Sequence, residues 1–343
     1  MTPPDTDTSG SAVPTPSGER EIAGDAQQLV ENLGEARDQI QKVIYGQRDV
    51  IDETLITLLS GGHALLVGVP GLGKTLLVET LGSVLGLAET RIQFTPDLMP
   101  ADILGSEVLE QDNDGKRSFR FVKGPIFSQL LMADEINRAS PRTQAALLQA
   151  MQESRVSIAG EYHNLPRPFH VLATQNPIEQ EGTYPLPEAQ LDRFLMQIDI
   201  TYPDSGSERE IILNTTGLAQ HKVRETLSAK QLADAQTLVR QVPVGESVID
   251  AILTVVRNGR PETTDIDSVR DYVAWGPGPR ASQALMLASR ARALLTGRYA
   301  PSVEDVIALA KPVLRHRMAL GFAARAEGLT IDQVIESLTE PLG

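Results

Sequence analysis

Residues 64–75 (ALLVGVPGLGKT) decide the fold, because they join a short apolar strand to a glycine-rich turn and the start of a helix. Residues 64–67 are apolar, and helical periodicity continues from residue 75 to residue 85. Residues 68–75 contain the pattern Gly-x-x-x-x-Gly-Lys-Thr, whose backbone N–H groups and lysine close around phosphates. The sequence therefore predicts a phosphate-binding loop within a parallel α/β sheet.

This loop supplies most of the expected nucleotide ligands. Lys74 has the length to reach the β and γ phosphates, and the hydroxyl of Thr75 is suited to hold Mg²⁺. The amino terminus of the following helix adds the positive end of its dipole. The residues assigned to ATP binding here are Gly68, Pro70, Gly71, Leu72, Gly73, Lys74, Thr75 and Leu76.

A second apolar run, residues 130–133, ends in the adjacent carboxylates of Asp134 and Glu135. Adjacent acids at the end of a strand are often only solvated, but beside a phosphate-binding loop they are typical of an ATPase. We assign Asp134 to the Mg²⁺ site and Glu135 to the role of general base toward the attacking water.

Five short apolar runs separated by helical stretches predict a doubly wound parallel α/β domain over residues 21–203. These runs are residues 64–67, 91–94, 130–133, 170–174 and 197–200. Two helices, one from residue 25 onward and one over residues 47–59, are expected before the first strand. Residues 204–343 show helical periods without a further strand and predict an all-α domain. Residues 1–20 are rich in Pro, Ser, Thr and Gly and predict a disordered tail.

Two β-hairpins are expected as insertions, at about residues 99–122 and 154–165. In the first, residues 106–111 and 117–122 alternate around Asn113-Asp114-Gly115. In the second, residues 155–158 and 161–163 alternate around Ala159-Gly160. Ordinary surface hairpins would show the same pattern, so their composition alone assigns them no partner.

Composition excludes several classes of protein. The formal net charge is −14, which disfavours binding to nucleic acid, because phosphate backbones are bound by Lys and Arg. The chain has no cysteine, which excludes disulfides and thiolate metal sites. No apolar run approaches the length of about 18 residues that a membrane helix needs, and no signal peptide is recognisable. We therefore expect a cytoplasmic protein that is not inserted in a membrane.

Beyond these motifs, the chain resembles the AAA+ ATPases, and within them the MoxR family, over roughly residues 40–320. The resemblance is carried by residues 93–105 (QFTPDLMPADILG), 134–138 (DEINR), 145–153 (AALLQAMQE), 173–177 (ATQNP), 188–194 (EAQLDRF) and 276–280 (GPGPR). It implies a nucleotide-binding domain with a five-stranded parallel sheet, followed by a helical lid, with ATP and Mg²⁺ as cofactors.

The resemblance also implies roles for residues outside the phosphate-binding loop. Asn176 matches sensor 1, which orients the attacking water. Arg193 matches the arginine finger, which enters the site of a neighbouring subunit. Arg280 matches sensor 2, which would contact phosphate in its own subunit. Residues that match the segment lining the adenine pocket are Val43, Ile44, Tyr45 and Gly46.

The function implied by the resemblance is ATP hydrolysis coupled to remodelling or maturation of a protein client. A ring homo-oligomer, a hexamer, and a partner with a von Willebrand factor A domain are implied with it. In this clade, hairpins inserted at these two positions project toward the pore of the ring. Two alternatives remain: a DNA-acting AAA+ motor or transcription activator, and a chelatase-type ATPase subunit. Both share the architecture.

Overall fold

The protein is described by a computed structural model that covers residues 16–111, 117–179, 182–216 and 222–343, with side chains from residue 27 onward. Predictions for the first fifteen residues of the tail, and for the hairpin turn at residues 113–115, lie outside these residues. The last part of the predicted tail is helical, because α1 (Pro16–Gln41) begins earlier than expected. Proline is tolerated in the first helical turn, and the Glu-Arg-Glu run that follows favours helix.

A five-stranded parallel sheet forms the centre of the α/β domain, in the order β2-β5-β8-β1-β9. All five predicted strands are confirmed, with small shifts at their ends. The strands are β1 (Ala64–Val67), β2 (Glu89–Gln93), β5 (Leu130–Asp134), β8 (His170–Gln175) and β9 (Met196–Asp199). β1 lies between β8 and β9, and β5 lies between β2 and β8. Because the strands are parallel, the segments that follow β1, β5 and β8 meet at the carboxyl ends of the strands.

Alternate residues of the strands feed two hydrophobic cores, as the two-residue period of a buried strand requires. Leu66 of β1 packs with α2 (Arg48–Leu59), α3 (Lys74–Val84) and the helices of the lid. Leu65 faces the other way, toward α5 (Pro141–Glu153) and the base of the inserted hairpins. The core on the first face continues into the lid, so both domains share it.

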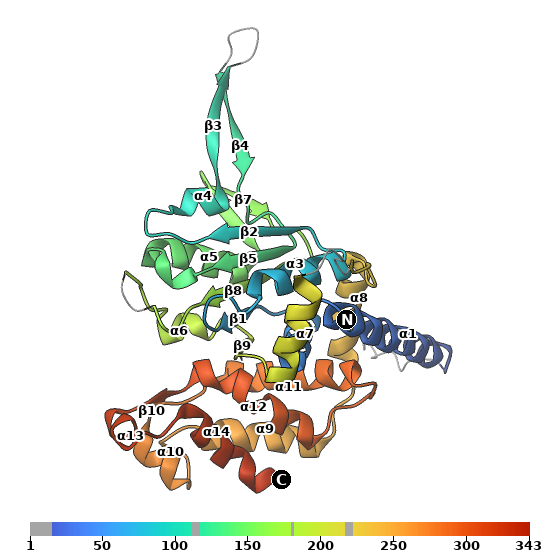
Figure 1. The fold of residues 1–343 in the computed structure, drawn as a ribbon, viewed down its shortest axis with the longest axis vertical. Coiled ribbons are helices and arrows are strands. Elements are labelled where there is room, and N and C mark those ends of the chain that lie inside the picture. Colours follow the sequence, from blue (N-terminus) through green and yellow to red (C-terminus); the bar gives the residue numbers. More distant parts are fainter. Residues whose placement is uncertain (1–15, 112–116, 180–181, 217–221) are drawn as a thin grey trace, which may run out of the picture.

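Both inserted hairpins are present. β3 (Gly105–Gln111) pairs with β4 (Arg117–Lys123), and β6 (Arg155–Ile158) pairs with β7 (Glu161–Asn164). The first hairpin follows the short helix α4 (Pro100–Leu104) and projects from the end of the molecule opposite the lid (Figure 1). The rings of Phe121 and His163 stack with centroids 4.1 Å apart, so the two hairpins touch.

After β9 the chain is mostly helical. Its helices are α7 (Ser205–Thr215), α8 (Ala229–Gln241), α9 (Glu246–Asn258), α10 (Asp267–Tyr272), α11 (Pro279–Leu295), α12 (Val303–Leu314), α13 (Phe322–Glu327) and α14 (Ile331–Thr339), with the 3-10 turns η2 (Arg315–Arg317) and η3 (Glu340–Leu342). Two short elements come earlier: the 3-10 turn η1 (Ile136–Arg138) follows β5, and α6 (Glu188–Leu191) precedes β9.

The expectation of no further strand was wrong. β10 (Val273–Trp275) and β11 (Ala319–Leu320) form a small antiparallel pair in the lid. Strands of two or three residues are too short to produce a recognisable two-residue period, so the pattern of the sequence did not reveal them.

Candidate nucleotide site

The phosphate-binding loop runs from the end of β1 to the start of α3. Gly71 and Gly73 have φ of +85° and +77°, in the left-handed region where a side chain would be strained. A Cβ atom on Gly68 would lie 2.7 Å from the carbonyl oxygen of Ile200, which follows β9. Glycine is therefore required at three of the assigned positions, and the loop offers backbone N–H groups at the start of α3.

Lys74 lies at the mouth of this loop, where its Nζ donates a hydrogen bond to the carbonyl oxygen of Gly68. Burial lowers the pKa of Lys74, and the carboxylates of Asp134, Glu135 and Glu179 oppose this shift. The ammonium group is thus close to all three acids. A phosphate oxygen that replaced the Gly68 carbonyl as the hydrogen-bond acceptor would stabilise the charged form of Lys74.

Asp134 ends β5 with only 9% of its surface exposed. Its Oδ1 accepts a hydrogen bond of 2.5 Å from the hydroxyl of Thr174, and its Oδ2 accepts one of 2.5 Å from the guanidinium of Arg91. Thr174 comes from β8 and Arg91 from β2, the two strands that flank β5. The Asp134 carboxylate also acts electrostatically on Lys74 and offers the oxygen ligands that Mg²⁺ prefers.

Glu135 has φ of +55°, which is uncommon for a residue other than glycine and typical of strained functional positions. Its backbone N–H donates to the Thr174 hydroxyl at 2.8 Å. Its carboxylate accepts a hydrogen bond of 2.6 Å from Gln93 and contacts Arg138 at 2.9 Å. The proposed base is therefore held by two side chains in this structure.

Arg138 is shared between two acids. Its guanidinium forms hydrogen bonds of 2.6 Å with both oxygens of Glu179, which follows Asn176 in the sensor 1 loop. The hydrogen bond to Glu179 raises the pKa of Arg138. Sequence reasoning missed Arg91, Gln93, Arg138 and Glu179 as part of the site, because no local pattern shows that they meet.

Asn176 follows β8, the strand between β1 and β5, and is 4% exposed. Its Oδ1 accepts a hydrogen bond of 3.2 Å from the backbone N–H of Ile178, which fixes the side chain. The structure therefore positions this amide between the end of β1, which leads into the phosphate-binding loop, and the end of β5, which Glu135 follows.

Val43, Ile44 and Tyr45 surround a cavity of about 130 Å³ together with Gly71, Leu72, Gly73 and Leu76 of the loop and helix. Gly46 lies just outside, where a Cβ atom would be 2.2 Å from the hydroxyl oxygen of Ser207 in α7. Four further residues line the cavity that the sequence did not indicate: Gln47, Pro203, Ile211 and Thr215. The last two belong to α7, which the sequence assigned to the lid domain.

Arg193 and Arg280 lie elsewhere. Both line a different cavity, of about 240 Å³, with Gly62 and His63, which precede β1. The phosphate-binding loop follows β1, so a four-residue strand of about 13 Å separates the two positions. Among the described residues, those around the 130 Å³ cavity include neither arginine.

In this structure Arg280 lies apart from the phosphate-binding loop of its own chain, and its expected contact with phosphate stays a prediction. Arg280, at the start of α11, pairs with Asp192 at 3.7 Å, directly beside Arg193. Asp192 is in turn fixed by the buried Arg317, which donates to its Oδ1 at 2.7 Å. Because α11 packs against α2 and the lid, Arg280 is kept near the amino ends of the strands.

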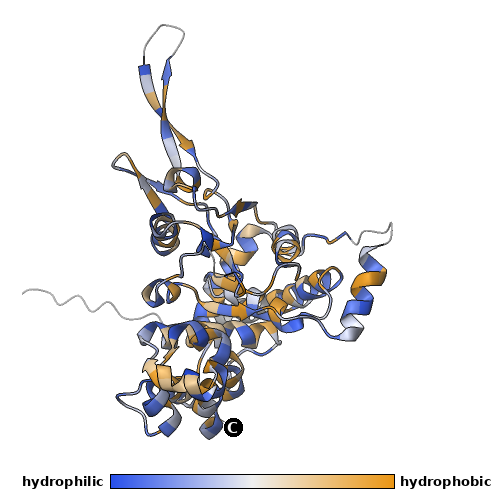
Figure 2. Cartoon of the chain, turned by 60° about the vertical axis from the view of Figure 1, so that its left-hand side comes forward, coloured by the Kyte–Doolittle hydropathy of each residue, from blue (hydrophilic) through white to orange (hydrophobic). Residues whose placement is uncertain are grey.

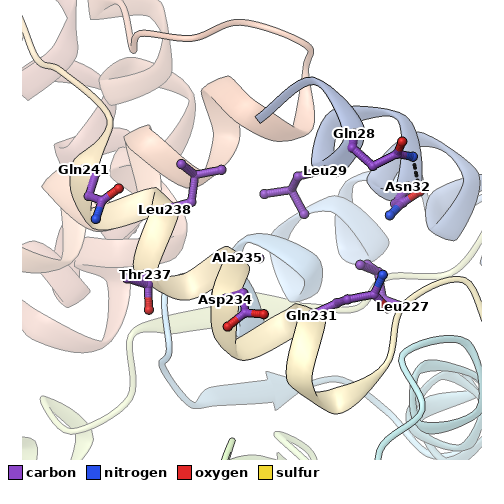
Figure 3. Close-up of a pocket in the computed structure, with 10 residues that line it drawn as sticks. All are labelled: Gln28, Leu29, Asn32, Leu227, Gln231, Asp234, Ala235, Thr237, Leu238 and Gln241. Carbon is purple, nitrogen blue, oxygen red and sulfur yellow. Dashed lines mark hydrogen bonds between the residues drawn. The ribbon is translucent and has the colours of Figure 1, made fainter. Parts of the chain in front are cut away.

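A larger hollow, of about 450 Å³, lies between α1 and α8 (Figure 3). It is lined by amides and apolar side chains, and Gln28 donates to Asn32 at 3.1 Å. Asp234 is the charged residue among its described lining residues, and no cation there could bind phosphate. Size therefore does not mark the nucleotide site.

Comparison with known proteins agrees with this geometry. Residues 63–196 match the family described as ATPase family associated with various cellular activities (AAA), and residues 267–338 match the AAA lid domain. The chain is 42% identical to Chaperone MoxR1 of Mycobacterium tuberculosis, over 91% of this chain and 82% of that protein. The chain belongs to the MoxR family of AAA+ ATPases.

Other members of the family give the same result. Protein MoxR of Paracoccus denitrificans is 31% identical over 90% of this chain and 96% of its own. The crystal structure of a putative ATPase from Cytophaga hutchinsonii matches with a TM-score of 0.87 and 38% identity, covering 94% of this chain and 97% of that one. The five-stranded sheet followed by a helical lid is therefore the fold of a MoxR-type AAA+ protein.

Proposed function

We propose that this MoxR-family protein hydrolyses ATP with Mg²⁺ and uses the energy to remodel or mature a protein client. The observation that carries the proposal is that four residues lie together at the carboxyl ends of the strands: Lys74, Asp134, Glu135 and Asn176. These residue types are the ones that phosphoryl transfer to water requires.

In this proposal Lys74 and the loop N–H groups bind the phosphates, and Thr75 and Asp134 would hold Mg²⁺, which would supply positive charge to the phosphates. Glu135 takes a proton from the water whose oxygen bonds to the γ phosphorus, while the bond from that phosphorus to the β–γ bridging oxygen breaks. Asn176 orients the water. Before it acts as base in this proposal, the Glu135 carboxylate breaks its hydrogen bond with Gln93 and its ion pair with Arg138.

Arg193 and Arg280 complete the site from a neighbouring copy in this proposal. They lie near the amino ends of the strands, away from the phosphate-binding loop, and this position supports contact with phosphate in another subunit. A head-to-tail contact of this kind repeats until a ring closes, and we propose a hexamer.

The client-directed part rests on the names of relatives such as Chaperone MoxR1 and on the projecting hairpins. A von Willebrand factor A domain protein is the proposed partner, in the cytoplasm. Within the described residues, no helix is long and apolar enough to span a bilayer.

The test of hydrolysis uses two variants with different expected defects. Glu135→Gln should retain ATP binding but lose turnover by about 10² to 10⁴-fold, which is the usual contribution of a positioned general base. Lys74→Ala should lose ATP binding itself. Direct titration with ATP and steady-state phosphate release distinguish the two. Turnover of Glu135→Gln within threefold of the wild-type protein would exclude Glu135 as the base.

A further inference from the structure

Arg91 places a positive charge on the carboxylate that we assign to Mg²⁺. It belongs to β2, the edge strand of the sheet, on the side of the molecule from which the β3–β4 hairpin projects (Figure 2). Its Nη2 and Nε donate to one atom, Oδ2 of Asp134, at 2.5 Å and 3.2 Å. The other oxygen, Oδ1, accepts from the Thr174 hydroxyl at 2.5 Å. Both oxygens of Asp134 are therefore engaged, one of them by a cation.

The two partners of this ion pair differ in how firmly they are held. The Asp134 side chain is 13% exposed, and Thr174 and the buried strand β5 position it from inside the sheet. The Arg91 side chain is 51% exposed and reaches Asp134 from solvent. Its Nη2 also donates to Oε1 of Gln93 at 3.2 Å, so the guanidinium keeps an acceptor when it leaves Asp134. Arg91 can therefore be displaced without opening the core.

A guanidinium and Mg²⁺ compete for the same carboxylate oxygen. Mg²⁺ is held in proteins by one or two carboxylates together with waters and substrate phosphates. A second cation cannot bind Oδ2 beside the Arg91 guanidinium without repulsion. This repulsion weighs most on a metal ion that arrives alone, because ATP supplies further oxygen ligands and negative charge. Mg²⁺ that arrives with ATP has the ligands needed to displace Arg91.

Neutralisation of Asp134 also matters for the phosphates. Three acids, Asp134 among them, act electrostatically on Lys74. Without Arg91, the unpaired carboxylate of Asp134 would repel a nucleotide that carries no metal. Arg91 therefore lowers the affinity for metal alone and raises the affinity for metal-free ATP.

We propose that Arg91 ties the uptake of Mg²⁺ to ATP: it occupies Oδ2 of Asp134 in the nucleotide-free protein and yields this oxygen when metal and nucleotide bind together. Arg91 is then a positioning residue, which acts through Asp134. The alternative is an ion pair that only joins β2 to β5, two strands that the backbone ladder already pairs. This inference rests on the proposed ATPase function and names the residue that controls access to its metal site.

The test compares substitutions that remove or keep this charge. Arg91→Gln and Arg91→Thr remove it, and threonine favours strands, which guards β2 against a loss of propensity. Arg91→Lys keeps the charge, and Arg91→Gln/Asp134→Asn removes the carboxylate as well. The matched control is Arg120→Gln, because Arg120 is 63% exposed and pairs with Glu110 at 2.7 Å on the first hairpin.

Two binding measurements accompany the melting temperature of each variant. Electron paramagnetic resonance of free Mn²⁺, a probe for Mg²⁺, measures metal binding without nucleotide. Titration with a fluorescent, non-hydrolysable ATP analogue, in EDTA and in excess Mg²⁺, measures how far metal strengthens nucleotide binding. Neither measurement depends on turnover.

We expect Arg91→Gln and Arg91→Thr to bind Mn²⁺ alone about fivefold more tightly than the wild-type protein, as the loss of a partly exposed ion pair allows. Metal should strengthen their ATP binding about fivefold more than it does in the wild-type protein. The gain in Mn²⁺ affinity should vanish in Arg91→Gln/Asp134→Asn, and Arg91→Lys and Arg120→Gln should match the wild-type protein.

Unchanged Mn²⁺ affinity in folded Arg91→Gln and Arg91→Thr would overturn the inference, and so would a gain that persists without the Asp134 carboxylate. A lower melting temperature with unchanged metal affinity would identify an ion pair that only joins the two strands. A wild-type protein that does not bind ATP in the presence of Mg²⁺ would instead refute the proposed function itself.

Discussion

Arg138 links Glu135, the proposed base, to the loop that carries Asn176, and its two contacts act in opposite directions. Its guanidinium stabilises the charge of Glu135 at 2.9 Å, whereas Glu179 competes for that guanidinium at 2.6 Å. Arg138 is 38% exposed, so the pair is screened and contributes about 0.2 to 1 kcal/mol. That energy corresponds to a factor of about 1.4 to 5 in an equilibrium constant.

Opposite changes of kcat are therefore expected for two substitutions. Arg138→Ala should free Glu135 to approach the water and raise kcat, whereas Glu179→Gln should leave Arg138 to Glu135 alone and lower kcat, each by at most about fivefold. Steady-state phosphate release at saturating ATP measures both. Changes of equal sign, or none, would show that Arg138 only supports the local fold.

At the scale of elements, the exposed pair Leu109 and Phe119 is a distinctive feature of the β3–β4 hairpin. These residues face each other across the two strands and are 50% and 69% exposed. β2, which carries Gln93 and Arg91, leads through α4 into this hairpin, so contact at the hairpin is connected along the chain to the base Glu135.

Replacing both Leu109 and Phe119 by Ser should leave the basal ATPase rate within about twofold of the wild-type rate. Exposed substitutions usually change stability by about 0.5 kcal/mol or less. Stimulation of the ATPase by a protein client should be lost. Basal and stimulated rates are measured side by side, with Leu253→Ser as the control. A lower basal rate with the stimulation ratio preserved would place the hairpin in the hydrolytic machinery instead.

The elements differ in how far the sequence predicted them. The sheet and both hairpins follow from local periods and from glycine-rich turns, which the sequence shows directly. The contacts of Arg91 with Asp134 and of Arg138 with Glu179 join residues about forty positions apart, and no local pattern contains them. The position of Arg280 depends on how the lid packs against α2, which periodicity cannot give.

At the scale of the whole molecule, buried histidines lie where the amino ends of the strands meet the lid. Burial lowers the pKa of His63 to about 3 and that of His170 to about 4, and His316 shifts in the same direction. These histidines are neutral in the folded protein but titrate near 6.5 when unfolded. The unfolded chain then binds more protons below pH 6.5, so stability falls as the pH drops from about 6.5 toward 4.

Glu53 opposes this trend. Burial raises its pKa to about 7, so the folded state binds a proton more tightly between about pH 7 and pH 4.5. We expect a net loss of about 2 kcal/mol between pH 6.5 and pH 5.5, and a loss of about 3 kcal/mol in Glu53→Gln. Urea unfolding at the two pH values measures this. Stability that is constant or higher at pH 5.5 would contradict the assignment of neutral buried histidines.

The central claim is that each ATP site is completed by the arginines of a neighbouring copy, and mixing two inactive variants tests it most directly. Arg193→Ala retains the phosphate-binding loop, and Lys74→Ala retains the arginine finger. Mixed in equal amounts, they should recover about a quarter of the wild-type ATPase rate if subunits exchange at random. Arg193→Ala mixed with the Lys74→Ala/Arg193→Ala double variant should recover nothing. Absence of recovery in the first mixture, with mixed oligomers shown to form, would contradict the account.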